Sequence, residues 1–145
     1  MKIRPAILII ENEKILTMQY SYSGQDVFNL PGGNLEFGEH LTDALVRELA
    51  EEMRIQVAIG ELIMVGEVHA LEQQKQTFHF IFVGKITEGT PTLNPKETSA
   101  IAIKWLNINE LSEKNLYPNI SEKLSQYLAK NLDNKYIGKI EQKWF

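Results

Sequence analysis

Alternating and β-branched hydrophobic positions dominate the N-terminal part of the chain. Residues 3–10 and 14–20 both have this pattern, and the polar residues 11–13 separate them. Two such segments joined by a short polar turn are typical of a β-hairpin. We therefore expect a hairpin here, followed by a polar loop over residues 21–26, which contain Gly24.

Hydrophobic residues recur every three or four positions over residues 41–53, which predicts an amphipathic helix. The residues that share this spacing are Leu41, Ala44, Leu45, Leu49 and Met53. No glycine or proline interrupts the segment, so it is the clearest helical pattern in the chain. A second amphipathic pattern over residues 118–132 predicts another helix, with Pro118 in its first turn.

Three later segments predict strands: residues 55–70, 77–86 and 101–106. One long helix among several strands indicates an α+β fold. Residues 132–145 have no pattern that assigns them a structure or a role.

Composition narrows the class of protein further. The chain has 145 residues, of which 43% are hydrophobic and 23% are charged, as in an ordinary globular domain. These values exclude disordered and collagen-like chains and predict one domain over residues 1–145. The chain contains no cysteine, which excludes disulfide scaffolds, thiolate metal sites and cysteine nucleophiles.

The net charge and the hydropathy of the chain indicate which binding partners to expect. There are 15 basic and 19 acidic residues, a net charge of −4, which opposes unassisted binding to nucleic acid. An anionic substrate would therefore need a cation as intermediary. The longest apolar run, residues 6–10, is far shorter than the roughly 20 residues that cross a bilayer, and the N-terminus lacks a signal-peptide core. We expect a cytoplasmic protein without a membrane partner.

Three carboxylates lie close together on the predicted helix. Glu48, Glu51 and Glu52 occupy positions i, i+3 and i+4, and helical geometry places Glu52 within the apolar stripe and Glu48 at its edge. Their repulsion and partial burial require an explanation, and a hard divalent cation such as Mg²⁺ supplies one. The alternative is a solvated acidic face, which is the usual meaning of adjacent glutamates on a helix.

The spacing around these glutamates resembles the Nudix box of the Nudix hydrolase family. The matching positions, in order, are Gly33, Glu39, Arg47, Glu48, Leu49, Glu51, Glu52 and Ile55. The glycine that usually precedes the final aliphatic residue is replaced by Arg54. Residues 30–33 precede the box as they do in the family, and the resemblance extends over most of residues 3–128.

This resemblance implies a mixed sheet sandwiched between helices and a metal-dependent pyrophosphohydrolase. The implied reaction is in-line attack of water on a phosphorus atom of a small nucleotide or another diphosphate. Glu48, Glu51 and Glu52 would be the ligands of Mg²⁺ or Mn²⁺. Glu39 and Arg47 would support the geometry between loop and helix, and Gly33 would let the backbone fold tightly beside the metal.

Several other residues have either a functional or a purely structural role. The family's general base varies, so it is either a box glutamate or Glu97 in the polar stretch 94–97, where the alternative is an ordinary loop residue. Arg4 on the first strand contacts a phosphate or is a surface arginine. Phe28, Tyr20 and Tyr22 stack on a base or belong to the core or a lid.

Arg54 is expected to affect stability more than catalysis. It occupies a position after the helix where a left-handed conformation favours glycine by about 1 kcal/mol, and no carboxylate is lost. A Nudix-like nucleotide-binding or regulatory domain without turnover is the alternative function. The net charge disfavours an RNA-end hydrolase. The substrate, the number of metal ions and the oligomeric state stay open, including a homodimer, which many relatives form.

Overall fold

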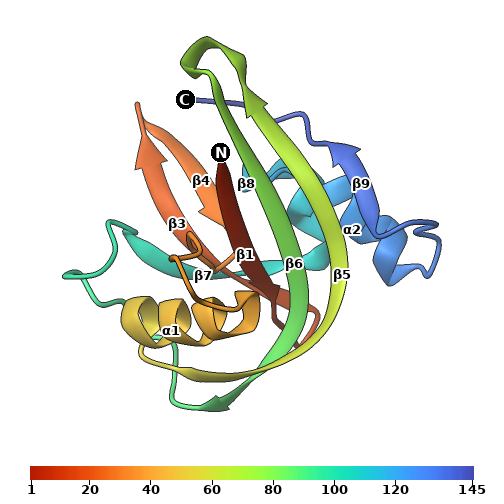
Figure 1. Ribbon diagram of the computed structural model, residues 1–145. Coiled ribbons are helices and arrows are strands. Elements are labelled where there is room, and N and C mark those ends of the chain that lie inside the picture. The colour runs from red at the N-terminus through yellow and green to blue at the C-terminus, as the bar shows by residue number, and fades with distance from the viewer.

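The computed structural model describes residues 1–145 and contains two mixed β-sheets with an α-helix on either side (Figure 1). The first sheet has the strand order β1-β6-β5-β9. These strands are Lys2–Leu8, Lys75–Glu88, Gln56–Ala70 and Tyr136–Lys139. β5 and β6 are antiparallel, whereas β1 and β9 each run parallel to their neighbour.

The second sheet has the order β2-β3-β4-β8, and β7 also pairs with β3. Its strands are Ile10–Glu11, Lys14–Tyr22, Gln25–Asn29, Leu116–Tyr117 and Ala102–Asn107. The predicted strands over 55–70, 77–86 and 101–106 correspond to β5, β6 and β7, so all three are confirmed.

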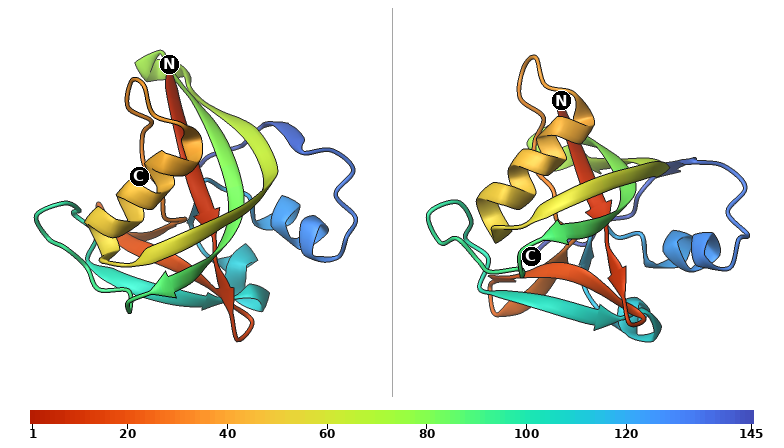
Figure 2. Two further views of the ribbon diagram at one scale, coloured as in Figure 1. Left: turned by 60° about the horizontal axis from the view of Figure 1, so that its bottom comes forward. Right: turned by 90° about the horizontal axis from the view of Figure 1, so that it is seen from below.

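The helix α1 spans Leu41–Met53, as predicted. It buries Ala44, Leu45, Leu49 and Met53 and packs against β1 and β5. The second helix, α2, spans Ser121–Leu128 and buries Leu124. Figure 2 shows the two helices on opposite sides of the sheets, which confirms the predicted α+β sandwich. Short 3₁₀ helices at Leu71–Gln73 and Ile108–Glu113 complete the fold, and neither α-helix has the length and apolar character to span a bilayer.

The predicted N-terminal hairpin is wrong over most of its length. β1 pairs in parallel with β6, and only Ile10 and Glu11 turn back onto β3. Asn12 and Glu13 form that turn, both with positive φ as a type I′ hairpin turn requires. The physical reason is that residues 4–9 are buried on both faces, which suits a strand between two covering layers rather than one arm of an exposed hairpin.

Two other boundaries also differ from the prediction. Residues 21–26 are not a loop, because β3 and β4 extend through them and leave only a turn at Ser23 and Gly24. The second helix is shorter than the predicted 118–132: it ends at Leu128, Ala129 caps it, and Lys130 adopts a left-handed conformation. Pro118 therefore precedes the helix instead of lying in its first turn.

β1 separates two hydrophobic clusters and positions the loop before α1. Ala6 and Leu8 face the cluster that includes α2, and Ile7 and Ile9 face the cluster beneath α1. The free edge of β1 is covered by residues 31–35 through hydrogen bonds from Ile7 N to Pro31 O (2.9 Å) and from Leu35 N to Ile3 O (2.9 Å). This pairing holds the Pro-Gly-Gly segment against the sheet, next to α1.

Candidate functional site

α1 presents three carboxylates beside its buried face. Leu45, Leu49 and Met53 are at most 1% exposed and fix the orientation of the helix. The side chain of Glu48 is 15% exposed, whereas that of Glu51 is 41% exposed. The acidic groups therefore extend from a partly buried position out to solvent.

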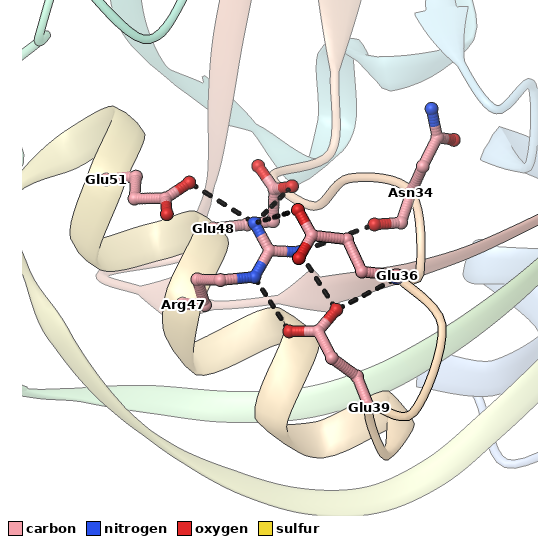
Figure 3. Close-up of polar contacts among 6 residues, drawn as sticks. All are labelled: Asn34, Glu36, Glu39, Arg47, Glu48 and Glu51. Atoms are coloured by element: carbon pink, nitrogen blue, oxygen red, sulfur yellow. Dashed lines mark hydrogen bonds and ion pairs between the residues drawn. The ribbon is translucent and has the colours of Figure 1, made fainter.

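Arg47 links these carboxylates to the preceding loop (Figure 3). Its Nε and Nη2 donate to the two oxygens of Glu39, at 2.7 and 3.0 Å, in a bidentate pair. Nη1 donates to Glu48 Oε1 at 3.1 Å and to Glu51 Oε2 at 3.2 Å. Nη2 also reaches the carbonyl of Asn34 at 3.4 Å. One guanidinium thus holds the loop, Glu48 and Glu51 in a common arrangement.

The electrostatics of this network differ from residue to residue. The Arg47 hydrogen bond, helped by the backbone N–H of Glu36, lowers the pKa of Glu39 to about 2. Burial raises the pKa of Glu52 to about 7, and the neighbouring charge of Glu48 adds to this. Burial also raises the pKa of Glu48, against the opposing effect of Arg47. Two partly buried carboxylates on successive helical turns therefore oppose each other's ionisation.

Gly33 lies directly against Glu48. A Cβ built at position 33 would overlap the carboxylate of Glu48. The backbone of Gly33 is held in place by a hydrogen bond from its N–H to Pro5 O, at 3.3 Å. The absence of a side chain at this position is therefore what lets the carboxylate approach the backbone.

The donor set of Glu48, Glu51 and Glu52 suits a hard divalent cation. In the structure, no three acidic or histidine side chains converge closely enough to enclose a metal ion, and Glu48 and Glu51 are both bonded to Arg47. Mg²⁺ usually keeps several waters and takes one or two carboxylates together with substrate phosphates. The residues therefore fit a cation that water and substrate coordinate in part, and such a cation would relieve the repulsion between Glu48 and Glu52.

Arg4 is buried, not a surface arginine. It is 9% exposed, and its Nη2 donates to Leu30 O at 2.9 Å. Its guanidinium lies over the ring of Tyr117, 5.4 Å from the centroid, and Nη1 has no hydrogen-bond partner. Arg4 also lines a cavity of about 670 Å³ that Asn34 borders as well. Because the carbonyl of Asn34 is bonded to Arg47, this cavity adjoins the acidic network.

Of the three aromatic residues expected to stack on a base or to belong to the core or a lid, only Tyr22 lines the cavity. Phe28 is 8% exposed and belongs to the hydrophobic core, so the structure does not bring it to the cavity. Its neighbours Val27 and Asn29 do line the cavity, since alternate residues of a strand face opposite sides. Tyr22 also lines it, whereas the hydroxyl of Tyr20 is hydrogen-bonded to Thr98 Oγ1 at 3.0 Å.

Glu97 lies on an exposed turn beside the end of α1. The turn closes with a hydrogen bond from Glu97 N to Asn94 O, at 2.9 Å. Asn94 N in turn donates to the carbonyl of Glu52 at 2.9 Å, which attaches the turn to the helix. The carboxylate of Glu97 itself makes no hydrogen bond, so the structure brings the turn, but not the carboxylate, into contact with α1.

Sequence reasoning missed several residues at the cavity, among them Asn29, Tyr117 and Trp144. His79 is fully buried, its ring lies edge-on to Tyr117 at 5.2 Å, and burial lowers its pKa to about 3. The parallel pairing of β8 with β4 brings Tyr117 to the site, and no local sequence pattern signals such a long-range contact.

Comparisons with known proteins identify the family and support the fold. The model of the NUDIX domain matches residues 1–128. Nudix hydrolase 5 of Arabidopsis thaliana is 24% identical over 140 residues, which are 92% of this chain and 46% of that protein. The chain thus spans about half the length of that relative. A Bacillus subtilis (strain 168) protein named as a candidate 8-oxo-dGTP diphosphatase is 27% identical over 106 residues, covering 73% of this chain and 67% of that protein.

A solved structure supports the same fold. The MutT protein from Methanosarcina mazei Go1 has a TM-score of 0.74 and 20% identity, over 90% of this chain and 94% of that chain. The match of the domain model includes α1 with its glutamates, Arg47 and the Pro-Gly-Gly segment that packs on β1. The chain is therefore a member of the Nudix family.

Proposed function

We propose that this protein is a divalent-metal-dependent pyrophosphohydrolase that cleaves the diphosphate linkage of a small nucleotide. The observation that carries the proposal is the pair of partly buried, mutually repelling carboxylates, Glu48 and Glu52. Arg47 holds Glu48 and also reaches the carbonyl of Asn34, which lines the cavity. Membership of the Nudix family supports the reaction class. The name of the Bacillus subtilis relative supports a nucleotide substrate.

The metal would be Mg²⁺ or Mn²⁺, held by Glu48, Glu51 and Glu52. A cation bound there would neutralise charge on the diphosphate and activate the attacking water. Arg47 would keep Glu48 and Glu51 oriented through its hydrogen bonds, while the bidentate pair with Glu39 holds Arg47 itself in place. Gly33 would allow the Glu48 carboxylate to stay against the backbone.

Two carboxylates are candidates to accept the proton of the attacking water. Glu52 has the raised pKa that suits a general base near neutral pH. Glu97 is exposed, and a hydrogen bond attaches its turn to the carbonyl of Glu52. Because Glu52 is also a proposed ligand, a variant at Glu97 gives the cleaner distinction between them.

The cavity of about 670 Å³ would take the remainder of the substrate. This volume is within the range of typical small-molecule sites. Arg4 contributes a buried positive charge to the cavity wall, and no ion pair with a carboxylate offsets that charge in the structure. An anionic ligand would offset it, which agrees with a nucleotide.

A product assay tests this proposal. The purified protein is incubated with nucleoside triphosphates, sugar nucleotides and dinucleoside polyphosphates, each with Mg²⁺, with Mn²⁺ and with excess chelator. Chromatographic detection of a nucleoside monophosphate as product, only where metal is present, is the expected result. Nucleotide binding without release of any product would instead indicate a regulatory or binding domain.

A further inference from the structure

The chain continues beyond the Nudix domain and returns to the cavity. After residue 128, the last one matched by the domain model, β9 pairs with β5. The following segment, residues 140–145, is held in place at Ile140 and at Gln142. Ile140 is 5% exposed, and its N–H donates to Glu67 O at 2.7 Å. The side chain of Gln142 accepts from Asn119 N at 2.9 Å and donates to Leu116 O at 3.3 Å.

These contacts direct the rest of the segment into the cavity wall. Gln142, Lys143, Trp144 and Phe145 all line the cavity. The ring of Trp144 lies 6.1 Å from that of Tyr117, which also contacts the guanidinium of Arg4 and the ring of His79. Trp144 nevertheless remains 55% exposed. A large aromatic side chain that is held at a cavity wall and left half open to solvent is available to stack on a planar ligand.

The polar lining favours a nucleotide as that ligand. Four cationic side chains line the cavity and no acidic side chain does, although the chain as a whole has a net charge of −4; the four are Lys2, Arg4, Lys75 and Lys143. Arg4 Nη1 and Asn29 Oδ1 are buried and have no hydrogen-bond partner. A site with positive charge, an aromatic wall, a spare donor and a spare acceptor matches phosphate groups joined to a heteroaromatic base.

We propose that Trp144 is a substrate-binding residue that stacks on the base of the nucleotide, so that the segment following the Nudix domain takes part in selecting the substrate. This inference rests on the proposed function only for the identity of the ligand as a nucleotide. It predicts an effect on KM rather than on kcat, because Trp144 belongs to the cavity wall and not to the network around Arg47.

Tryptophan fluorescence tests the contact without turnover. The chain has two tryptophans, so Trp105→Phe leaves Trp144 as the only one. This variant is titrated, in chelator, with adenosine, guanosine and uridine 5′-diphosphates, and with methylenediphosphonate as a diphosphate that lacks a base. We expect at least one nucleotide to change the Trp144 emission and methylenediphosphonate to leave it unchanged. Unchanged emission with all three nucleotides overturns the inference.

Kinetics provide the second test. Trp144→Leu should raise KM by about tenfold for the best nucleotide and change kcat by less than about threefold, while Trp144→Phe retains most of the affinity. Tyr136→Leu is the matched control, since Tyr136 is 60% exposed on the neighbouring β9 but does not line the cavity. Wild-type KM in Trp144→Leu contradicts the inference. Absence of hydrolysis by the wild-type protein would contradict the proposed function instead, and the fluorescence titration would still decide the role of Trp144.

Discussion

The backbone of Gly33 and the carboxylate of Glu48 are in direct contact. A Cβ at position 33 would overlap the carboxylate carbon and lie 2.7 Å from Oε2. Glycine is thus needed at position 33 because the Glu48 carboxylate occupies the space that a side chain would fill. From this position the carboxylate accepts a hydrogen bond from Arg47 Nη1 at 3.1 Å. The neighbouring Gly32 differs: a Cβ there would overlap the carbonyl of Pro5 and lie 2.8 Å from the Cα of Ala6, both of which belong to the backbone of β1.

Gly33→Ala should therefore impair catalysis more than stability. The flexible end of Glu48 can move aside, so we expect Tm to change little while kcat falls by about tenfold or more, because a proposed metal ligand is displaced. Gly32→Ala is the matched control and should lower Tm strongly, because the backbone of β1 has to shift. Thermal unfolding and product release are measured on both variants. Wild-type kcat in Gly33→Ala would show that the position of Glu48 does not matter.

Arg54→Gly should stabilise the fold. Arg54 caps α1 with φ 56° and ψ 36°, the left-handed conformation expected from the resemblance, and its N–H is bonded to Ala50 O at 3.1 Å. Glycine adopts this conformation more easily, by about 1 kcal/mol. We expect a higher Tm and a nearly unchanged kcat, whereas Arg54→Ala, which keeps a Cβ, should not raise Tm. A decrease in Tm for Arg54→Gly would mean that greater freedom of the unfolded chain outweighs the relief of strain.

Glu52→Gln should raise Tm in chelator, and the gain should depend on pH. Burial and the charge of Glu48 raise the pKa of Glu52 from 4.5 to about 7 in the folded protein. The folded state therefore holds the proton more tightly than the unfolded state, and wild-type stability falls as the pH rises from about 4.5 through 7. The variant should gain several degrees over the wild type at pH 8 and little at pH 5.

Glu51→Gln is the control for this pH dependence. The side chain of Glu51 is 41% exposed and accepts a hydrogen bond from Arg47, so its replacement should not produce the same gain at pH 8. Thermal melts at pH 5 and pH 8 test both variants. A gain for Glu52→Gln that is equal at the two pH values would contradict the raised pKa.

Glu97→Gln tests the exposed turn. If Glu97 accepts the proton of the attacking water, kcat should fall by about a hundredfold with little change in KM or Tm, since its carboxylate makes no contact that stabilises the fold. Glu88→Gln is a suitable control, being another exposed glutamate, at the end of β6. A loss of kcat below about threefold would show that Glu97 is an ordinary loop residue without a catalytic role, and would favour Glu52 as the general base.

The sequence predicts the parts of this molecule that depend on local spacing. The bounds of α1 agree with the predicted 41–53 because its buried residues recur at helical spacing within one segment. Arg47 contacts Glu51 because residues four apart on a helix are neighbours. The pairing of β1 with β6 was missed, since partners such as Arg4 and His79 are far apart in sequence. The cavity was missed for the same reason: Arg4, Asn29 and Trp144 come from three distant segments.

We propose that the glutamates of α1 form a metal-dependent hydrolytic site. The decisive measurement is kcat for the best diphosphate substrate in wild type, Glu51→Gln and Glu52→Gln, each with Mg²⁺ and with excess chelator. We predict that wild-type turnover is lost in chelator and that each variant lowers kcat by about a hundredfold or more with Mg²⁺. Undiminished turnover in chelator would show that hydrolysis needs no metal, and near-wild-type kcat in both variants would remove α1 from the active site.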